Sequence, residues 1–362
     1  MKRLPSRVVA VIALVGAAAA GGSLPILARA LDTSSTVSGV VDLNEGSGVV
    51  GLDAAGNRLL LEGNESVDLP AAGGSKVRRS PDVQLVRGAA KAFGKDKIAK
   101  HSTRLDLSAL EIDDVEEVAW DGSRGAAFLV ASHSRTKTGK VKPERYKLAR
   151  LMFAGDRVAN SAATDALLPA LRKSFPFLAS AMDTAEPDVG GPNGALNIEG
   201  AVFVPAGSPG ARAGGGFLLL GLRSPTSANG DALALRLRHP HALFDRLRGA
   251  GAAAPDFDPA PVRLPLNGQG IRGMAYDPER KGCWIVSGRS AHDGKTDPWG
   301  LWFWDLKQGD RPRKATVPAD INLATPEGIC CLPLRGKPGL LLVEDANTPT
   351  SRYALFPKLP PP

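Results

Sequence analysis

One short phrase occurs five times along the chain, and it strongly limits the possible folds. Each copy begins with Gly, Val, Ile or Pro, continues with two polar or small residues and ends in two apolar residues. The copies span residues 46–50, 115–119, 198–202, 271–275 and 326–330, and their second positions are Ser47, Glu116, Glu199, Arg272 and Glu327. A second apolar run that ends in polar residues follows each copy. Repeats of this length, built from short strands, are typical of β-propeller blades.

The two ends of the chain predict how the ring closes. The last repeat stops at Phe356 after three strand-like segments, whereas the strand-like residues 35–43 precede the first copy without a partner. Open strand edges are costly. We therefore predict one all-β domain over residues 31–362, a five-bladed propeller whose last blade is completed by residues 35–43. Six blades are the alternative if residues 76–112 or 154–196 contain a divergent blade.

One insertion follows a helical pattern. Thr164 and Ser174 are suitable N-caps, and apolar residues between 167 and 178 supply a hydrophobic face. We predict a short helical insertion at about residues 164–182. It packs against the side or rim of the propeller, or it forms a lid over the channel.

The first thirty residues predict a secretory signal peptide. Lys2, Arg3 and Arg7 precede the apolar stretch from Val8 to Ala20, and a small-x-small sequence follows at residues 28–30. An uncleaved membrane anchor is the alternative. We expect a secreted or periplasmic protein with no stable membrane anchor after cleavage.

Charge and cysteine content narrow the possible partners. The formal net charge is +8, and the first thirty residues contain four basic and no acidic residues, so the remainder carries +4. This weak, scattered positive charge argues against nucleic-acid binding. Cys283, Cys330 and Cys331 form no metal-binding pair, and we expect buried free thiols rather than a disulfide. We also expect a monomer.

The repeat predicts where a ligand binds. The first strand of each blade starts at the face where the antiparallel second strand ends, so polar residues from both strands meet at one mouth of the channel. The residues predicted to bind a ligand there are Glu116, His133, Glu199, Arg223, Arg272, Arg289, Glu327 and Asp345. Ion pairs between neighbouring blades, such as Glu199 with Arg272, are the structural alternative.

Two kinds of ligand fit these residue types. Arginines bind phosphate or carboxylate groups through their planar fork, which favours a small anionic ligand, and we expect Arg223 and Arg272 to be solvated in the empty channel. Carboxylates bind hard cations, so a calcium site is predicted at Glu199, Glu327, Glu344 and Asp345. No other cofactor is expected. The sequence contains no nucleophile elbow and no phosphate loop, and a general-base role for His133 is an open hypothesis.

Four phrases carry a family resemblance. They stand at residues 197–200, 219–225, 270–273 and 326–328, and together they resemble the bacterial family called domain of unknown function 3616, best over residues 190–356. The resemblance implies a secreted or cell-envelope propeller and brings no catalytic residue. The Glu-Gly phrase is also similar to phytase-like and esterase-like propellers. Two functions therefore stand open: a propeller that binds a small ligand, and a calcium-assisted hydrolase that uses the same mouth.

Overall fold

The computed structural model describes most of the chain. The described residues are 36–70, 77–89, 93, 98–185, 190–211, 215–245, 253–291, 298–307, 309, 311–334, 337–346, 348–356 and 359–361. Residues Thr33–Pro362 form one compact unit. The predicted signal peptide at residues 1–30 lies outside the described residues.

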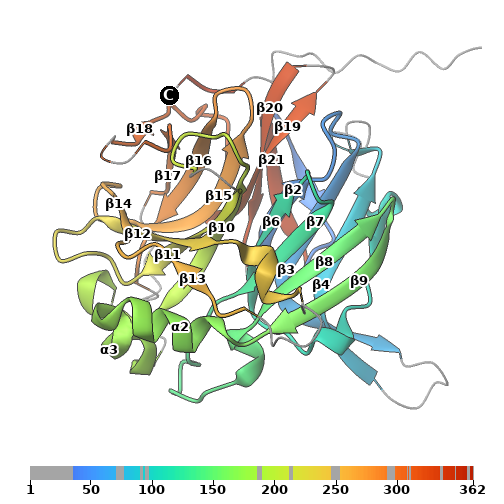
Figure 1. Cartoon of the computed structure of the whole chain (residues 1–362). Coiled ribbons are helices and arrows are strands. Elements are labelled where there is room, and N and C mark those ends of the chain that lie inside the picture. The colour runs from blue at the N-terminus through green and yellow to red at the C-terminus, as the bar shows by residue number, and fades with distance from the viewer. Residues whose placement is uncertain are drawn as a thin grey trace, which may run out of the picture. The chain divides into compact units, whose positions relative to one another are not determined.

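Five antiparallel sheets form the blades of the propeller (Figure 1). Blades 1 and 2 contain β2 (Gly46–Gly51), β3 (Arg58–Pro70), β4 (Val77–Arg87) and β5 (Ser102–Arg104), then β6 (Val115–Asp121), β7 (Ala126–Ala131), β8 (Leu148–Ala154) and β9 (Arg157–Thr164). Blade 3 contains β10 (Asn197–Val204), β11 (Phe217–Ser224) and β12 (Ala232–Arg238), which pairs with both β13 (Asp256–Phe257) and β14 (Val262–Leu264). Blade 4 contains β15 (Gly270–Asp277), β16 (Gly282–Gly288), β17 (Gly300–Trp304) and β18 (Arg313–Lys314).

The last blade joins the two ends of the chain. Blade 5 contains β19 (Pro326–Leu334), β20 (Lys337–Glu344), β21 (Ser351–Phe356) and the N-terminal strand β1 (Val37–Val41). The register of β1 against β21 runs from Val37 opposite Leu355 to Val41 opposite Ser351. In Figure 1 the red C-terminal strands accordingly lie beside the blue N-terminal ones. The predicted five-bladed ring, closed by an N-terminal strand, is confirmed.

Close contacts hold this closure in place. The Ser351 hydroxyl donates to the carbonyl of Leu43 at 2.9 Å and accepts the N–H of Gly46 at 2.7 Å. Gly39 lies against the ring of Tyr353, where an added Cβ would stand 2.6 Å from the phenolic oxygen. The closing strand therefore needs a glycine at this position, and Ser351 fixes the turn into blade 1.

Apolar side chains fill the spaces between consecutive blades. Clusters of buried residues join blades 1 and 2, 2 and 3, 3 and 4, and 4 and 5, and one more joins blade 5 to blade 1. The last of these contains fully buried Leu43, and Tyr353 meets Phe93 edge to face at a centroid distance of 5.0 Å. Such aromatic pairs add about 0.5–1.5 kcal/mol beyond their burial. Central strands such as β10 and β11 are thus buried on both faces, because each blade packs between two others.

The helical insertion belongs to one of these cores. It contains α2 (Leu167–Ser174), a short 3-10 helix at Pro176–Leu178 and α3 (Ala179–Asp183). Leu167, Leu171 and Phe175 pack with residues of blades 2 and 3, and Figure 1 shows α2 and α3 beside β11 and β13. The predicted helical insertion is confirmed, and it packs against the propeller side rather than forming a lid. The N-caps predicted at Thr164 and Ser174 are wrong, because α2 starts after Ala166 and ends at Ser174, and the next helix starts after Phe175.

Short 3-10 helices and three free cysteines complete the fold. Other 3-10 helices lie in the connections, at Ile98–Lys100, Ser108–Leu110, Pro143–Tyr146, Gly191–Asn193 and Pro240–Leu243. All three cysteines are free thiols, with Cys283 and Cys330 buried, as expected. Burial raises the pKa of both buried thiols well above the ordinary value. Among the described residues, no helix is long and apolar enough to cross a membrane.

Candidate functional site

The pairing register brings the two polar phrases of each blade together at one mouth of the channel. In blade 5, Pro326 at the start of β19 lies opposite Glu344 at the end of β20. In blade 3, Asn197 lies opposite Ser224 in the same way. The inner strands β2, β6, β10, β15 and β19 contact one another around the ring. Their first residues therefore surround the axis of the propeller.

In blades 3, 4 and 5, the acidic and basic side chains at this mouth form ion pairs with one another. Arg272 places Nε 2.9 Å from Glu199 Oε2, and its guanidinium also contacts Glu327. Arg223 donates to Glu199 Oε1 at 2.6 Å and to the carbonyls of Arg289 and Ala291. The side chains of Glu199 and Glu327 are 3% exposed.

This arrangement corrects one expectation about the arginines. Arg223 and Arg272 were predicted to be solvated in an open channel, but each residue is only 8% exposed and bound to carboxylate. Each guanidinium forms an ion pair with a buried acid, and a buried acid needs such a partner. The prediction was wrong because Glu199 lies within reach of Arg223 in the same blade, and Glu199 and Glu327 of the two neighbouring blades lie within reach of Arg272.

Blades 1 and 2 show the opposite pattern. Glu62 ends the core part of β3 with 0% exposure, and both its carboxyl oxygens lack a hydrogen-bond partner within the described part of the chain. Glu116 on β6 is 6% exposed, and Glu45 lies in the turn before β2. Among the described residues, neither of these two side chains forms an ion pair. We call Glu45, Glu62 and Glu116 the carboxylate cluster.

The pKa shifts of the cluster have a common physical origin. Burial raises the pKa of Glu62 and Glu116 well above the usual range, and nearby carboxylates add to both rises. Burial also raises the pKa of Glu45 to about 7, with contributions from Asp345 and Glu65 that exposed Lys137 partly offsets. The negative charge of Asp114 acts on all three members. They therefore face a shared region of negative potential.

Two further acids border the cluster. Asp114 binds Arg145 at 2.7 Å and precedes the inner strand of blade 2. Asp345 follows β20, and its charge raises the pKa of both Glu45 and Glu116. Of the residues predicted to bind a ligand, Glu116 and Asp345 thus lie at the cluster, whereas Glu199, Arg223, Arg272 and Glu327 form the ion-paired side of the same mouth.

The other predicted site residues lie at or beyond the edge of this mouth. Arg289 is half-buried, and its carbonyl accepts from Arg223. Glu344 is held inside blade 5 by Arg352 and by the N–H of Thr325. His133 is 1% exposed, its Nδ1 lies 2.8 Å from the carbonyl of Ala131, and burial lowers its pKa to about 4. Among the described residues, no acid is hydrogen-bonded or ion-paired to the His133 ring, so the structure offers little support for the general-base hypothesis.

The described residues provide no set of side chains that could bind a metal ion directly. In the part of the chain that the structure describes, no three His, Cys, Asp or Glu side chains are grouped so that they could hold a metal ion. Of the residues predicted to bind calcium, Glu199 and Glu327 are paired with Arg272, and Glu344 is paired with Arg352.

Sequence reasoning missed the role of three acidic residues. Glu45 and Asp114 stand directly before the phrase in blades 1 and 2, both with left-handed backbone at φ 50° and 56°. No other blade has an acid at this position. Glu117 stands where the other four copies of the phrase have Gly48, Gly200, Gly273 and Gly328. These departures from the repeat were visible in the sequence.

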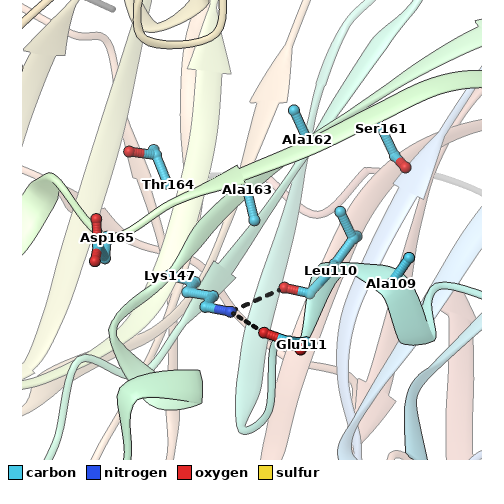
Figure 2. Close-up of a pocket in the computed structure, with 9 residues that line it drawn as sticks. All are labelled: Ala109, Leu110, Glu111, Lys147, Ser161, Ala162, Ala163, Thr164 and Asp165. Carbon is cyan, nitrogen blue, oxygen red and sulfur yellow. Dashed lines mark hydrogen bonds and ion pairs between the residues drawn. The ribbon is translucent and has the colours of Figure 1, made fainter. Parts of the chain in front are cut away.

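Two surface pockets lie apart from the mouth. One pocket has a volume of about 440 Å³ and lies between β9 and the 3-10 helix at Ser108–Leu110. Figure 2 shows the residues that line it. Lys147 Nζ, its cation, lies 3.1 Å from the carbonyl oxygen of Leu110 and 3.6 Å from Glu111 Oε2. A pocket of about 180 Å³ beside Phe217 contains Arg236, which is paired with Asp258. Neither pocket includes a predicted site residue.

Comparisons with known proteins give only distant similarities. No protein-family model matches the chain, and no curated protein sequence is similar to it. Among solved structures, a nidogen/laminin complex is similar over 83% of this chain and 72% of its own, at 10% identity and a TM-score of 0.37. The RS223 β-xylosidase is similar over 86% and 92%, at 10% identity and a TM-score of 0.40. Such values support no inference about activity.

Proposed function

We propose that this protein is a binding module that holds a small cation at the carboxylate cluster of blades 1 and 2. The observation that carries the proposal is Glu62, an acid with 0% exposure whose two carboxyl oxygens have no hydrogen-bond partner among the described residues. Burying such a group without a partner costs about 1–3 kcal/mol, and more when it is charged. A bound cation removes this cost.

The charge distribution favours a cation over the anion predicted from the arginines. Arg223 and Arg272 are already bound to Glu199 and Glu327, so an anion would have to compete with buried carboxylates. The carboxylate cluster lacks such partners and has raised pKa values. In the absence of a cation, protons neutralise it instead, and a positively charged ligand replaces those protons.

The geometry also limits the kind of cation. Because no three acidic side chains in the described residues are grouped for direct metal ligation, the ligand is an ammonium group or a cation that keeps part of its water shell. Both present a compact positive charge with donors or water directed at carboxyl oxygens. The test below separates these two sources of the same chemistry.

Secretion and the family resemblance remain proposals of ours. The signal-like start of the chain and its phrases at residues 197–200 and 326–328 support a secreted propeller of the domain of unknown function 3616 family. The calcium-assisted hydrolase is the second candidate, and it shares the same mouth. Hydrolysis of a phosphoester or ester panel with added calcium is the outcome that would favour it.

Isothermal titration calorimetry of calcium chloride and of methylammonium chloride tests the proposal. We expect one of the two cations to bind the native protein, and Glu62→Gln and Glu116→Gln to weaken that binding about tenfold or more, since hydrogen bonds to charged groups are worth about 1.5–3 kcal/mol. Glu279→Gln is the matched control, because Glu279 is exposed in the turn between β15 and β16, at the end of these strands that lies away from the mouth. Binding of inorganic phosphate without binding of either cation would contradict the proposal.

A further inference from the structure

The inner strand of every blade has an irregularity at the same point of the repeat. The pairing with the second strand shifts between Gly46 and Gly48 in blade 1 and between Val115 and Glu117 in blade 2. The same shift occurs at residues 198–200, 271–273 and 326–328. A bulge leaves one residue outside the ladder and redirects nearby backbone groups. Here the shift recurs around the axis, so backbone groups from several blades turn toward the centre.

One side chain receives these backbone groups. The Glu117 carboxylate accepts the N–H of Val118 at 3.0 Å and the N–H of Met274 at 3.3 Å. The backbone N–H groups of Val49 and Ala201 also lower the pKa of Glu117, so they lie close enough to act as donors to its carboxylate. These four donors come from β6, β15, β2 and β10, so one carboxylate joins the inner strands of four blades. Glu117 is 0% exposed.

The repeat shows why this position is special. The other four blades have glycine where blade 2 has Glu117. A Cβ at Gly273 would lie 1.8 Å from the carbonyl oxygen of Glu327, so neighbouring inner strands leave no room for a side chain there. A Cβ at Gly48 would lie 3.1 Å from Glu117 Oε1 and from Glu62 Oε2. The ring of glycines therefore creates a narrow space at the axis that a single carboxylate fills.

The donors determine which chemical group fits this space. Convergent backbone N–H groups form an anion-binding concavity, as in other backbone nests. A protonated carboxyl would direct its O–H at N–H groups, whereas a carboxylate accepts from all of them. Burial raises the pKa of Glu117, and the four N–H donors oppose that rise. The negative charge of Glu117 in turn contributes to the raised pKa of Glu62.

We propose that the N–H groups of Val49, Val118, Ala201 and Met274 form an anion-binding site at the propeller axis, specific for a small carboxylate, and that the chain's own Glu117 is its occupant. We call it the axial anion site. With the side chain of Glu117 removed, the site takes a free carboxylate such as formate. This inference does not depend on a cation binding at the carboxylate cluster, because it concerns backbone donors and a different side chain.

Rescue of Glu117→Ala by sodium formate tests the proposal. Thermal unfolding of this variant should start at a lower temperature than in the parent, and formate should recover part of the loss in a saturable manner, as a ligand of the native state must. Glu117→Gln is the matched control, because its amide fills the space and leaves no room for formate. A rise of equal size in the parent, Glu117→Ala and Glu117→Gln would be a general salt effect and would overturn the proposal, as would no rise in a folded Glu117→Ala.

Amide hydrogen exchange supplies a second test if Glu117→Ala does not fold. The isosteric Glu117→Gln keeps one acceptor oxygen and loses the charge, so the amides of Val49, Ala201 and Met274 should exchange about tenfold faster relative to the parent. The amide of Leu60, inside the β3–β4 pairing, serves as the internal reference. Unchanged exchange at all three axial amides would show that Glu117 is not held by them and would overturn the proposal.

Discussion

Arg272 Nε lies 2.9 Å from Glu199 Oε2, and this contact joins the inner strands of blades 3 and 4 inside the channel mouth. The same guanidinium reaches Glu327 of blade 5. Three consecutive blades are therefore linked by one buried cation. Burial and the charge of Arg223 lower the pKa of Arg272, and the negative charges of Glu199, Asp345 and Glu116 oppose that shift.

Replacement of this cation should be strongly destabilising. Arg272→Met leaves Glu199 and Glu327 buried with less positive charge, and breaking a buried pair costs about 3–5 kcal/mol. Urea unfolding of the parent and the variant measures the difference. Arg124→Met is the control, because the Arg124 side chain is 57% exposed and its removal should cost about 0–1 kcal/mol. Equal stabilities of the two variants would show that the Arg272 contacts are energetically unimportant.

The closing strand gives a second expectation. Leu43 follows β1 and is fully buried between blades 5 and 1, so Leu43→Ala should cost about 2–5 kcal/mol. Val40→Ala is the matched control on the same segment, since Val40 is 51% exposed and its truncation should change stability by about 0.5 kcal/mol or less. Chemical unfolding curves of the parent and the two variants measure both losses of stability. A loss at Leu43 no larger than that at Val40 would argue that blade 5 holds together without this segment.

The five-bladed architecture could be predicted from the sequence because the strand pattern of one blade recurs five times along the chain. The phrases at residues 115–119 and 326–330 mark inner strands, and the unpaired strand at residues 35–43 predicts the closure. The partners of individual charges were not accessible. Whether Arg272 is solvated or buried depends on side-chain reach across the axis, which no local pattern contains. The role of Glu117 as an acceptor at the axis was missed because the sequence alone does not distinguish it from the other polar residues of the channel mouth. Only its place at a position that is glycine in the other four copies marks it.

Stability should fall as pH rises through neutrality. The pKa of Glu45 is raised from 4.5 to about 7, so the folded state holds this proton more tightly than the unfolded chain. The resulting stabilisation is fully present below the unfolded pKa and is lost as pH rises through the folded value. Glu62 and Glu116 act in the same direction. Melting temperatures measured from about pH 5 to about pH 8 should decline, and Glu45→Gln should reduce the slope. A slope unchanged in Glu45→Gln would exclude this residue as a source.

Loss of the unpartnered acid should stabilise the protein. Glu62→Met removes a buried carboxyl whose oxygens have no hydrogen-bond partner among the described residues, and we expect a gain of about 1–3 kcal/mol. Sites built for ligands commonly carry such a cost in stability. Glu199→Met is the contrasting control, since Glu199 is equally buried but paired, and its loss should cost about 3–5 kcal/mol. A destabilised Glu62→Met would mean that the carboxyl is satisfied in the native state.

The most direct test of cation binding at the carboxylate cluster is a count of protons released on binding. Calorimetric titration with calcium or methylammonium, in two buffers of different protonation enthalpy, separates the proton heat from the binding heat. The proposal predicts binding near neutral pH with net proton release, because the cation replaces protons on Glu45, Glu62 and Glu116, and it predicts a smaller release in Glu116→Gln. Binding without proton release, or no binding of either cation, would contradict it.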